Sequence, residues 1–341
     1  MIDLFSDTLS KPTPAMRKAM AEAEVGDEQK REDPTTNRLQ EMVAKMLGKE
    51  AAVFLPSGTM CNAIGVKAHT QPSDAMLCDR MAHVYRTEFG GAALLSGVTT
   101  EPIEGVGGLF TPDQLKLALD RSHPTYGASP RLVCVEQTHN YGGGTIWPLD
   151  QLREVCSVAH DRGLLTHMDG ARLFNASVAS GISVKDYAQT LDSVWIDLSK
   201  GLGCPVGAVL AGTKEFIARS WRFKHLFGGA LRQSGILAAA GIYSLEHHID
   251  RLREDHENAR LLAEGLSQLK GIRVENSPPQ TNILFFDISG TGLKMPEFHQ
   301  KTQSAGVRFS GAAGRIRAVT HLDISRADIE RAVRLLADLL K

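Results

Sequence analysis

The sequence predicts an α/β protein with a mostly parallel β-sheet in a large domain, followed by a smaller α+β domain. Through the first two thirds of the 341 residues, short apolar strands alternate with longer helical segments. This alternation is typical of a parallel sheet covered by helices on both faces. From about residue 250 the regular alternation ends. We therefore expect a large domain over residues 1–249, which includes the N-terminal segment, and a small C-terminal domain over residues 250–341.

The first helices are expected where capping residues precede helical sequence. Thr13 can cap a helix that starts at Pro14 and runs to about residue 24, because proline is favoured in the first helical turn. A second helix is expected over residues 36–47, where a glycine follows. A short strand over residues 51–55 then leads into a helix that opens at Ser57.

The remaining elements follow from apolar runs and helical stretches. In the large domain, strands are expected at residues 75–78, 131–136, 164–168, 194–198 and 208–211, with a helix at 149–162. Long helical stretches at 231–248 and 249–269 lead into the small domain, where strands are expected at 271–275, 282–287 and 315–320. Ser325 can cap the last helix, with Asp328 three residues further on.

Composition narrows the class of protein. Hydrophobic residues make up 43% and charged residues 23% of the chain, which predicts a globular core. A net charge of −1 argues against nucleic acid as the main partner. The first residues do not resemble a signal peptide and no run of about 18 apolar residues occurs, so we expect a cytoplasmic protein without a membrane span. The five cysteines contain no C-x-x-C pair, so buried thiols are expected and no metal site.

A lysine stands in an unusual position. The apolar run at residues 193–198 ends at Lys200, and Gly201 and Gly203 follow in a turn. Burial lowers the pKa of a lysine and makes its amine nucleophilic, as Schiff-base chemistry requires. The alternative is a lysine that extends from the end of a strand into solvent.

An aspartate ends the preceding apolar strand. Asp169 follows residues 163–168 and is followed by Gly170, Ala171 and Arg172. An aspartate at one strand end and Lys200 at a later one form the pattern of a pyridoxal phosphate (PLP) site, where the carboxylate faces the pyridine nitrogen and the lysine forms the imine. Taken alone, Asp169 and Arg172 would more simply be an ion pair between neighbours.

Three further motifs fit such a site. Gly58 and Thr59 lie between a strand and a helix, where backbone N–H groups can bind a phosphate; an ordinary helix cap is the alternative. His83 is one of twelve histidines and could equally be a packed side chain. Arg317 lies in an expected strand of the small domain, where it could hold a substrate carboxylate through two hydrogen bonds or simply face solvent.

Taken in order, these residues resemble the low-specificity L-threonine aldolases, PLP enzymes of the aspartate-aminotransferase fold (fold type I). The shared segments span nearly the whole chain: Ser6-Asp-Thr8, Gly26-Asp27, Glu32-Asp-Pro34, Pro56-Ser-Gly-Thr-Met60, Glu136-Gln-Thr-His-Asn140, Met168-Asp-Gly-Ala-Arg-Leu-Phe-Asn-Ala176, Leu198-Ser-Lys-Gly-Leu-Gly203, Pro205-Val-Gly207, Gly228-Gly229, Arg232-Gln233 and Arg317-Ala-Val-Thr-His321. The resemblance implies a large domain with a mostly parallel seven-stranded sheet and an aldehyde-lyase that cleaves β-hydroxy-α-amino acids to glycine and an aldehyde.

The resemblance also implies roles for individual residues. Lys200 would hold PLP, Asp169 would pair with its ring nitrogen, and His83 would stack on the ring, all three as catalytic residues. The base would be a histidine or an ordered water near His83. The other implied ligands are Gly58 and Thr59 for the phosphate, Arg172 beside the phenolic oxygen and the substrate, and Ser6, Arg317 and the loop residue His123 for the substrate. Arg232 would reach a phosphate in a neighbouring subunit of a homodimer or homotetramer.

The chain departs from the family pattern at several positions. Phe5 replaces the arginine usual before Ser-Asp-Thr, and Gln29, Lys30 and Arg31 replace Val-Tyr-Gly. Lys30 and Arg31 are therefore expected to favour an acidic or polar β-substituent. Two other functions remain open on the same scaffold: a β-eliminating lyase or dehydratase that releases ammonia and a 2-oxo acid, and a non-catalytic protein that retains the fold for assembly or regulation.

Overall fold

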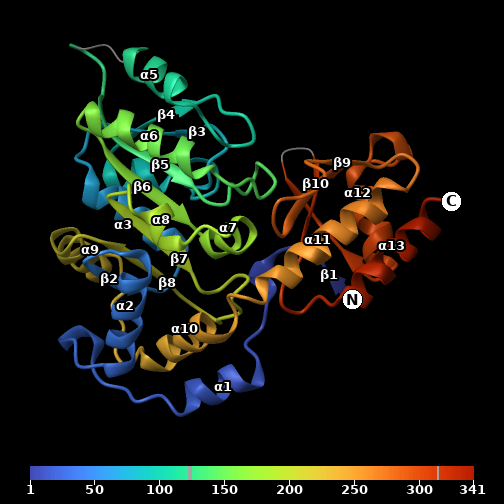
Figure 1. Ribbon diagram of the computed structural model, residues 1–341, viewed down its shortest axis with the longest axis horizontal. Coiled ribbons are helices and arrows are strands. Elements are labelled where there is room, and N and C mark those ends of the chain that lie inside the picture. Colours follow the sequence, from blue (N-terminus) through green and yellow to red (C-terminus); the bar gives the residue numbers. More distant parts are fainter. Residues whose placement is uncertain (122–124, 313–314) are drawn as a thin grey trace.

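The large domain is built on a seven-stranded sheet. The computed structural model describes residues 1–121, 125–312 and 315–341 (Figure 1). In spatial order the strands are β2 (Ala51–Leu55), β8 (Ala208–Gly212), β7 (Ser193–Asp197), β6 (Leu165–Gly170), β5 (Ser129–Glu136), β3 (Asp74–Asp79) and β4 (Thr99–Ile103). Strand β8 runs in the opposite direction to the other six strands. The predicted fold class, with its mostly parallel sheet, is confirmed.

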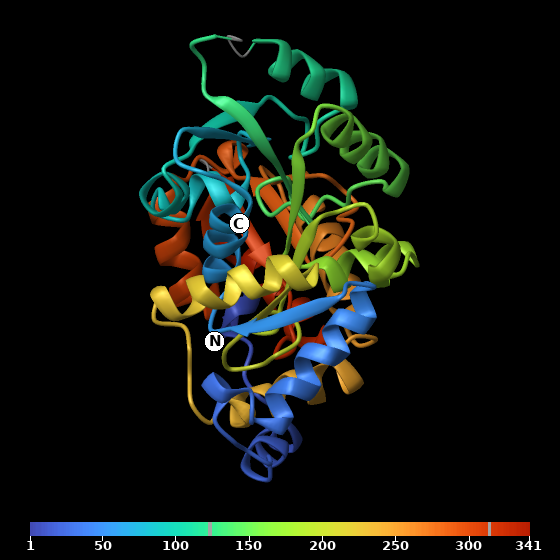
Figure 2. The ribbon, with the colours of Figure 1, turned by 90° about the vertical axis from the view of Figure 1, so that its left-hand side faces the viewer.

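Helices cover this sheet. They are α1 (Pro14–Ala21), α2 (Pro34–Leu47), α3 (Gly58–His69), α4 (His83–Arg86), α5 (Pro112–Arg121), α6 (Leu149–Asp161), α7 (Leu173–Ser180), α8 (Val184–Ala188), α9 (Lys214–Leu226) and α10 (Gly235–His247). The hydroxyl of Thr13 accepts a hydrogen bond from the Met16 N–H and caps α1, as expected. Helix α2 starts two residues earlier than expected, because Asp33 caps it and Pro34 is compatible with its first turn. Figure 2 shows α9 packed across β2 at one edge of the sheet.

Strand β4 is the one strand of the large sheet that the sequence pattern missed. Its residues, Thr-Thr-Glu-Pro-Ile, are mostly polar and include Pro102. A proline interrupts the hydrogen-bonding ladder, so it is tolerated on an edge strand and not in the middle of a sheet. Because β4 pairs only with β3, Pro102 is accommodated at the edge.

The small domain contains an antiparallel sheet and three helices. Its strands lie in the order β12 (Ser310–Ala312), β13 (Arg315–Val319), β10 (Ile283–Asp287) and β9 (Arg273–Glu275), and its helices are α11 (Leu252–Ser267), α12 (Met295–Ser304) and α13 (Arg326–Leu339). Ser325 and Asp328 form the expected capping box of α13. Phe286, Phe298 and Phe309 pack together in its core.

The N-terminal residues pack against the small domain. Strand β1 (Ile2–Asp3) pairs in parallel with β11 (Val307–Arg308), and Ile2 and Leu4 are buried in the core of the small domain. The chain then crosses to the large domain, where α1 packs against α10 (Figure 1). The division after residue 249 stays a prediction. Among the described residues, no helix combines the length and the apolarity needed to span a membrane.

Candidate active site

The carboxyl ends of the parallel strands place three side chains together. The register pairs Glu136 at the end of β5 with Asp169 of β6, and Asp169 with Trp195 of β7. Residues paired across adjacent strands point to the same face of a sheet. All three side chains line one cavity of about 280 Å³, at the edge of a parallel sheet where ligands usually bind.

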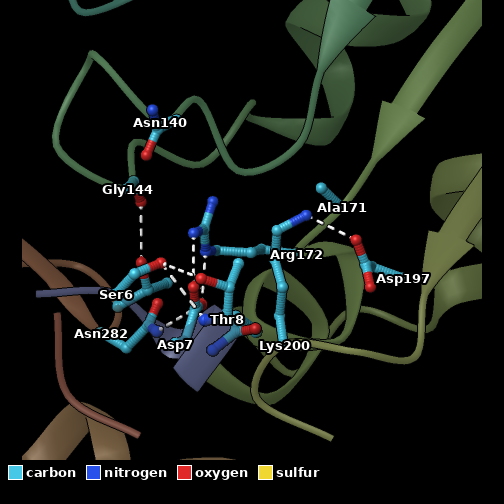
Figure 3. A network of polar contacts seen from close by, with 12 residues as sticks. Ser6, Asp7, Thr8, Asn140, Gly144, Ala171, Arg172, Asp197, Lys200 and Asn282 are labelled. Carbon is cyan, nitrogen blue, oxygen red and sulfur yellow. Dashed lines mark hydrogen bonds and ion pairs between the residues drawn. The ribbon is translucent and has the colours of Figure 1, made fainter. Parts of the chain in front are cut away.

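Lys200 reaches the same cavity from the turn after β7. Its Nζ lies 2.5 Å from Oδ2 of Asp197 (Figure 3), and its carbonyl accepts a hydrogen bond of 2.6 Å from the Ser10 hydroxyl. The lysine side chain is 18% exposed, so the amine is open to a small molecule in the cavity. Lys200 is therefore held by both its backbone and its side chain, with the amine facing inward.

The turn between β2 and α3 forms a narrow anion-binding cradle. Ser57 caps α3 by accepting a hydrogen bond from the Met60 N–H, and Gly58 and Thr59 line the cavity. A Cβ at Gly58 would lie 2.3 Å from Cη2 of Trp195. Glycine is thus required here, and the exposed N–H groups of the helix terminus suit a phosphate.

His83 begins α4 and faces the cavity beside a buried acid. Its Nδ1 lies 3.0 Å from Oε1 of Glu88, and its backbone N–H donates to Glu136. Burial alone lowers the pKa of His83. The hydrogen bond to Glu88 and the nearby carboxylates of Asp169 and Glu136 outweigh burial, so that the pKa of the imidazole is raised overall.

Asp169 is fully enclosed and held by an amide. The Asn62 side chain donates a 2.8 Å hydrogen bond to Oδ2 of Asp169, and the Ala171 N–H donates to Oδ1. Burial raises the pKa of Asp169 to about 6, and the Glu136 carboxylate adds to this rise. A positively charged ring nitrogen in the cavity would stabilise this carboxylate.

Arg172 is fixed by a second aspartate. Asp7 accepts two hydrogen bonds of 2.7 Å from its guanidinium, at Nε and Nη2 (Figure 3). Asn282, which directly precedes β10 in the small domain, donates to Asp7 as well. Burial raises the pKa of Asp7, but Arg172 outweighs burial and holds this pKa well below its ordinary range. One carboxylate thus joins the N-terminal segment to both domains.

Arg317 brings a second guanidinium to the cavity from β13. Its hydrogen bonds go to Ser310, Asn140 and the Phe5 carbonyl, and within the described residues it has no carboxylate partner. Burial and the nearby Arg172 lower the pKa of Arg317 and outweigh the Asp7 carboxylate, which raises it. A bound carboxylate would supply that charge, and the hydroxyl of Ser6 lines the same cavity.

Eight of the predicted site residues surround this single cavity: Ser6, Gly58, Thr59, His83, Asp169, Arg172, Lys200 and Arg317. Their chemistry fits PLP: an amine for the aldehyde, a buried carboxylate for the ring nitrogen, and helix N–H groups for the phosphate. The unpaired guanidinium of Arg317 fits an amino-acid carboxylate. The individual roles stay predictions.

Three other predicted residues, all described by the structure, do not line the cavity of their own chain. Arg232 is 62% exposed and pairs with Asp27 at 3.0 Å. Lys30 and Arg31 are exposed as well, and Arg31 lies over the Trp221 ring. His123 lies outside the described residues. The expected effect of Lys30 and Arg31 on substrate choice therefore gains no support from this chain alone.

Sequence reasoning missed several polar residues of the site. Asp197 had a usable signal, because it ends an apolar strand as Asp169 does. Asp7, Glu136 and Asn140 lie in segments shared with the family but were given no role, whereas Asn62 and Glu88 had no signal in the sequence. Only a three-dimensional arrangement brings these residues together.

Comparisons with known proteins agree with this geometry. The profile of the beta-eliminating lyase family matches residues 3–289. A low-specificity L-threonine aldolase of Arabidopsis thaliana is 40% identical over 96% of this chain and 93% of its own length. The low specificity L-threonine aldolase of Escherichia coli K12 is 39% identical over 96% of both chains. The structure of a Leishmania major threonine aldolase superposes with a TM-score of 0.85 at 19% identity, over the full length of both chains.

The sheet, the lysine after β7 and the aspartate at the end of β6 define a class of protein, the enzymes with PLP fold type I. Structures of serine palmitoyltransferase with PLP share this fold with a TM-score of 0.75 and 18% identity, covering 99% of this chain and 87% of the other. Within that class, the chain belongs to the beta-eliminating lyase family, as one of its low-specificity L-threonine aldolase members.

Proposed function

We propose that this protein is a PLP-dependent aldehyde-lyase that cleaves L-threonine, L-allo-threonine and related β-hydroxy-α-amino acids to glycine and an aldehyde. The observation that carries the proposal is one cavity that presents the Lys200 amine, the buried Asp169 carboxylate and the unpaired Arg317 guanidinium together. The names and identities of the curated relatives support the same activity.

The cofactor would be held at three points. The Lys200 amine would bind its aldehyde, Asp169 would accept a hydrogen bond from its ring nitrogen, and the N–H groups at Gly58 and Thr59 would bind its phosphate. His83 would stack on the ring, and Arg172 would lie beside the phenolic oxygen. When bound, PLP supplies an electron sink for the pair released as the Cα–Cβ bond breaks.

The chain's own residues orient the substrate and move its protons. Arg317 and Ser6 would hold the substrate carboxylate, and this contact fixes rotation about the amino nitrogen–Cα bond. The carboxylate contact would thereby present the Cα–Cβ bond for cleavage. A base in the cavity removes the β-hydroxyl proton as the aldehyde leaves, and a proton returned to Cα gives glycine.

We also propose that a second copy of the chain completes the site. The phosphate would be bound by N–H groups at Gly58 and Thr59. The positively charged side chains of the cavity, Arg172, Lys200 and Arg317, are assigned to other parts of the cofactor and to the substrate. Arg232 is exposed and held in place by Asp27, so it can reach the phosphate of a neighbouring subunit. A homodimer or homotetramer is the proposed assembly. A reducing, cytoplasmic compartment is proposed because all five cysteines are buried free thiols.

The test is product identification. The PLP-loaded protein is incubated with L-threonine and with L-allo-threonine, and glycine, acetaldehyde, ammonia and 2-oxobutyrate are quantified. Glycine with acetaldehyde in equal amounts is the expected result. Ammonia with 2-oxobutyrate would replace the aldolase by a β-eliminating lyase, and an absence of any turnover would favour a non-catalytic protein.

A further inference from the structure

The buried acid Glu88 is not used by the reaction described above. Its side chain is 4% exposed, and it lies two residues after α4 at the inner wall of the cavity. A carboxylate is rarely buried without a partner, because desolvation strongly disfavours the charge. The contacts of Glu88 therefore indicate what it does.

Two donors converge on one oxygen of Glu88. His83 Nδ1 lies 3.0 Å from Oε1, and the Asn62 amide nitrogen lies 2.7 Å from the same atom. An oxygen that receives an amide N–H on one side is an acceptor there. Nδ1 of the imidazole consequently carries a proton toward Glu88. In the neutral ring the proton-free nitrogen is then Nε2, which has no hydrogen-bond partner among the described residues.

The orientation of Asn62 is set by its other end. The indole N–H of Trp195 can only donate, and it lies 2.7 Å from Oδ1 of Asn62. The amide nitrogen must therefore face the two acids, at 2.7 Å from Glu88 and 2.8 Å from Asp169. One amide group thus joins the acid behind His83 to the acid expected at the cofactor's ring nitrogen.

A metal ion is a poor alternative occupant of this cluster. Ligand atoms of His83, Glu88 and Asp169 lie within 4.8 Å of one another, as they could around a cation. The N–H groups of Asn62, however, already point at both carboxylates and would repel a cation placed between them. The amide holds the acids together by hydrogen bonds instead.

We propose that Glu88 is a positioning residue that holds the Nδ1–H of His83 and thereby presents Nε2 as the base for the substrate's β-hydroxyl proton. The proposal rests on the aldolase function above and names the acceptor for its proton step. The hydroxyl O–H bond breaks, Nε2 becomes N–H, and the same proton is available for Cα of the glycine product. The step needs no net proton and no co-reactant.

Several charges face the His83 ring, and each bears on its titration. Glu88 follows α4, Asp169 ends β6 and Glu136 ends β5, and all three favour the protonated imidazole. Lys200 lines the same cavity and opposes them. The test must therefore remove the charge of Glu88 alone.

The experiment compares Glu88→Gln with the control Glu101→Gln, which alters an exposed acid of β4. Glutamine keeps an oxygen for both donors but removes the charge. The first readout is ¹⁵N NMR of histidine in the cofactor-free protein, with the His83 signals assigned by their loss in His83→Gln. We expect the wild-type neutral ring to carry its proton on Nδ1. In Glu88→Gln we expect a titration midpoint lower by about one unit, as loss of a neighbouring charge predicts.

The second readout is turnover of the PLP-loaded enzyme across pH. In Glu88→Gln the acid limb of kcat should move to lower pH, because a base with a lower pKa loses its proton earlier. We expect kcat to fall about tenfold, the scale of weakened general-base catalysis, with KM nearly unchanged. The control should match the wild type in both readouts.

The outcomes separate this proposal from the proposed function. An Nε2–H tautomer in the wild type, or an unshifted His83 midpoint in Glu88→Gln, overturns the role of Glu88 even if aldolase activity is present. The wild-type tautomer decides the matter even if Glu88→Gln does not fold. The expected NMR result without any aldolase turnover would support the pairing with His83 and would overturn the function instead.

Discussion

Replacing Asp7 with asparagine tests how strongly one carboxylate stabilises the fold. Asparagine has nearly the same shape, but it removes the charge that Arg172 contacts through two hydrogen bonds of 2.7 Å. Both side chains are buried. Removing one partner of such a pair costs about 3–5 kcal/mol, because the other charge stays buried without compensation. Asparagine retains one acceptor oxygen, so we take the lower end, about 3 kcal/mol.

Urea unfolding of the cofactor-free protein, followed by circular dichroism at pH 7, measures this loss. With a slope of about 3 kcal/mol per molar, the midpoint should fall by about 1 M. Asp113→Asn is the control, since Asp113 pairs with Lys116 while its own side chain is 90% exposed; it should leave the midpoint unchanged. A midpoint for Asp7→Asn within about 0.3 M of the wild type would refute the reasoning.

The difference in unfolding free energy between the wild type and Asp7→Asn should depend on pH in one direction. The pKa of Asp7 is lowered in the folded protein, so its pairing contributes stability at pH values above the unfolded value of about 3.9. That contribution is lost as pH falls through the lower, folded value. The gap between the wild type and Asp7→Asn should therefore be constant from pH 7 to pH 5 and shrink only in stronger acid. A gap that grows on acidification would contradict this assignment.

Two further predictions concern the cofactor cradle and a second buried pair. Gly58→Ala should weaken PLP binding at least tenfold, about 1.4 kcal/mol, because the added Cβ would clash with the buried Trp195 ring. A fluorescence titration with PLP measures this loss. The control Gly91→Ala should bind PLP normally, because a Cβ at Gly91 would have no atom within 4 Å. Lys224→Met should lower the free energy of unfolding by about 3 kcal/mol, because it leaves the buried Glu28 carboxylate without its ion-pair partner. Adding Glu28→Gln to this variant should recover most of the loss. If urea unfolding instead gives additive losses for the two substitutions, the two side chains act independently.

The sequence predicted those parts of the site that lie at the ends of elements. Lys200, Asp169 and Gly58 each follow or end an apolar strand, and the carboxyl ends of parallel strands meet at one edge of a sheet. Local pattern and sheet geometry were therefore sufficient to bring them together. The same logic predicted six of the seven strands of the large sheet and failed for β4, whose polar edge position has no alternating pattern.

The supporting residues could not be predicted in this way. Asn62 contacts Asp169 across 107 positions of sequence, and Asp7 contacts Asn282 across 275. Such pairs depend on how helices and domains pack, which a local pattern does not encode. The role of Arg232 cannot be tested in a single chain for a different reason. Its side chain does not line the cavity of its own chain, and its predicted role requires a second chain.

The pairing of β1 with β11 has a consequence for the order of events during synthesis. Residues 2 and 3 leave the ribosome long before their strand partners, residues 307 and 308. Contacts between such distant residues form late, because a long loop must close first. Ser6 and Asp7 follow directly on β1, so their places in the cavity depend on a strand that is synthesised about 300 residues later. The catalytic centre should therefore mature only after β11 is available for pairing, however early the large domain folds.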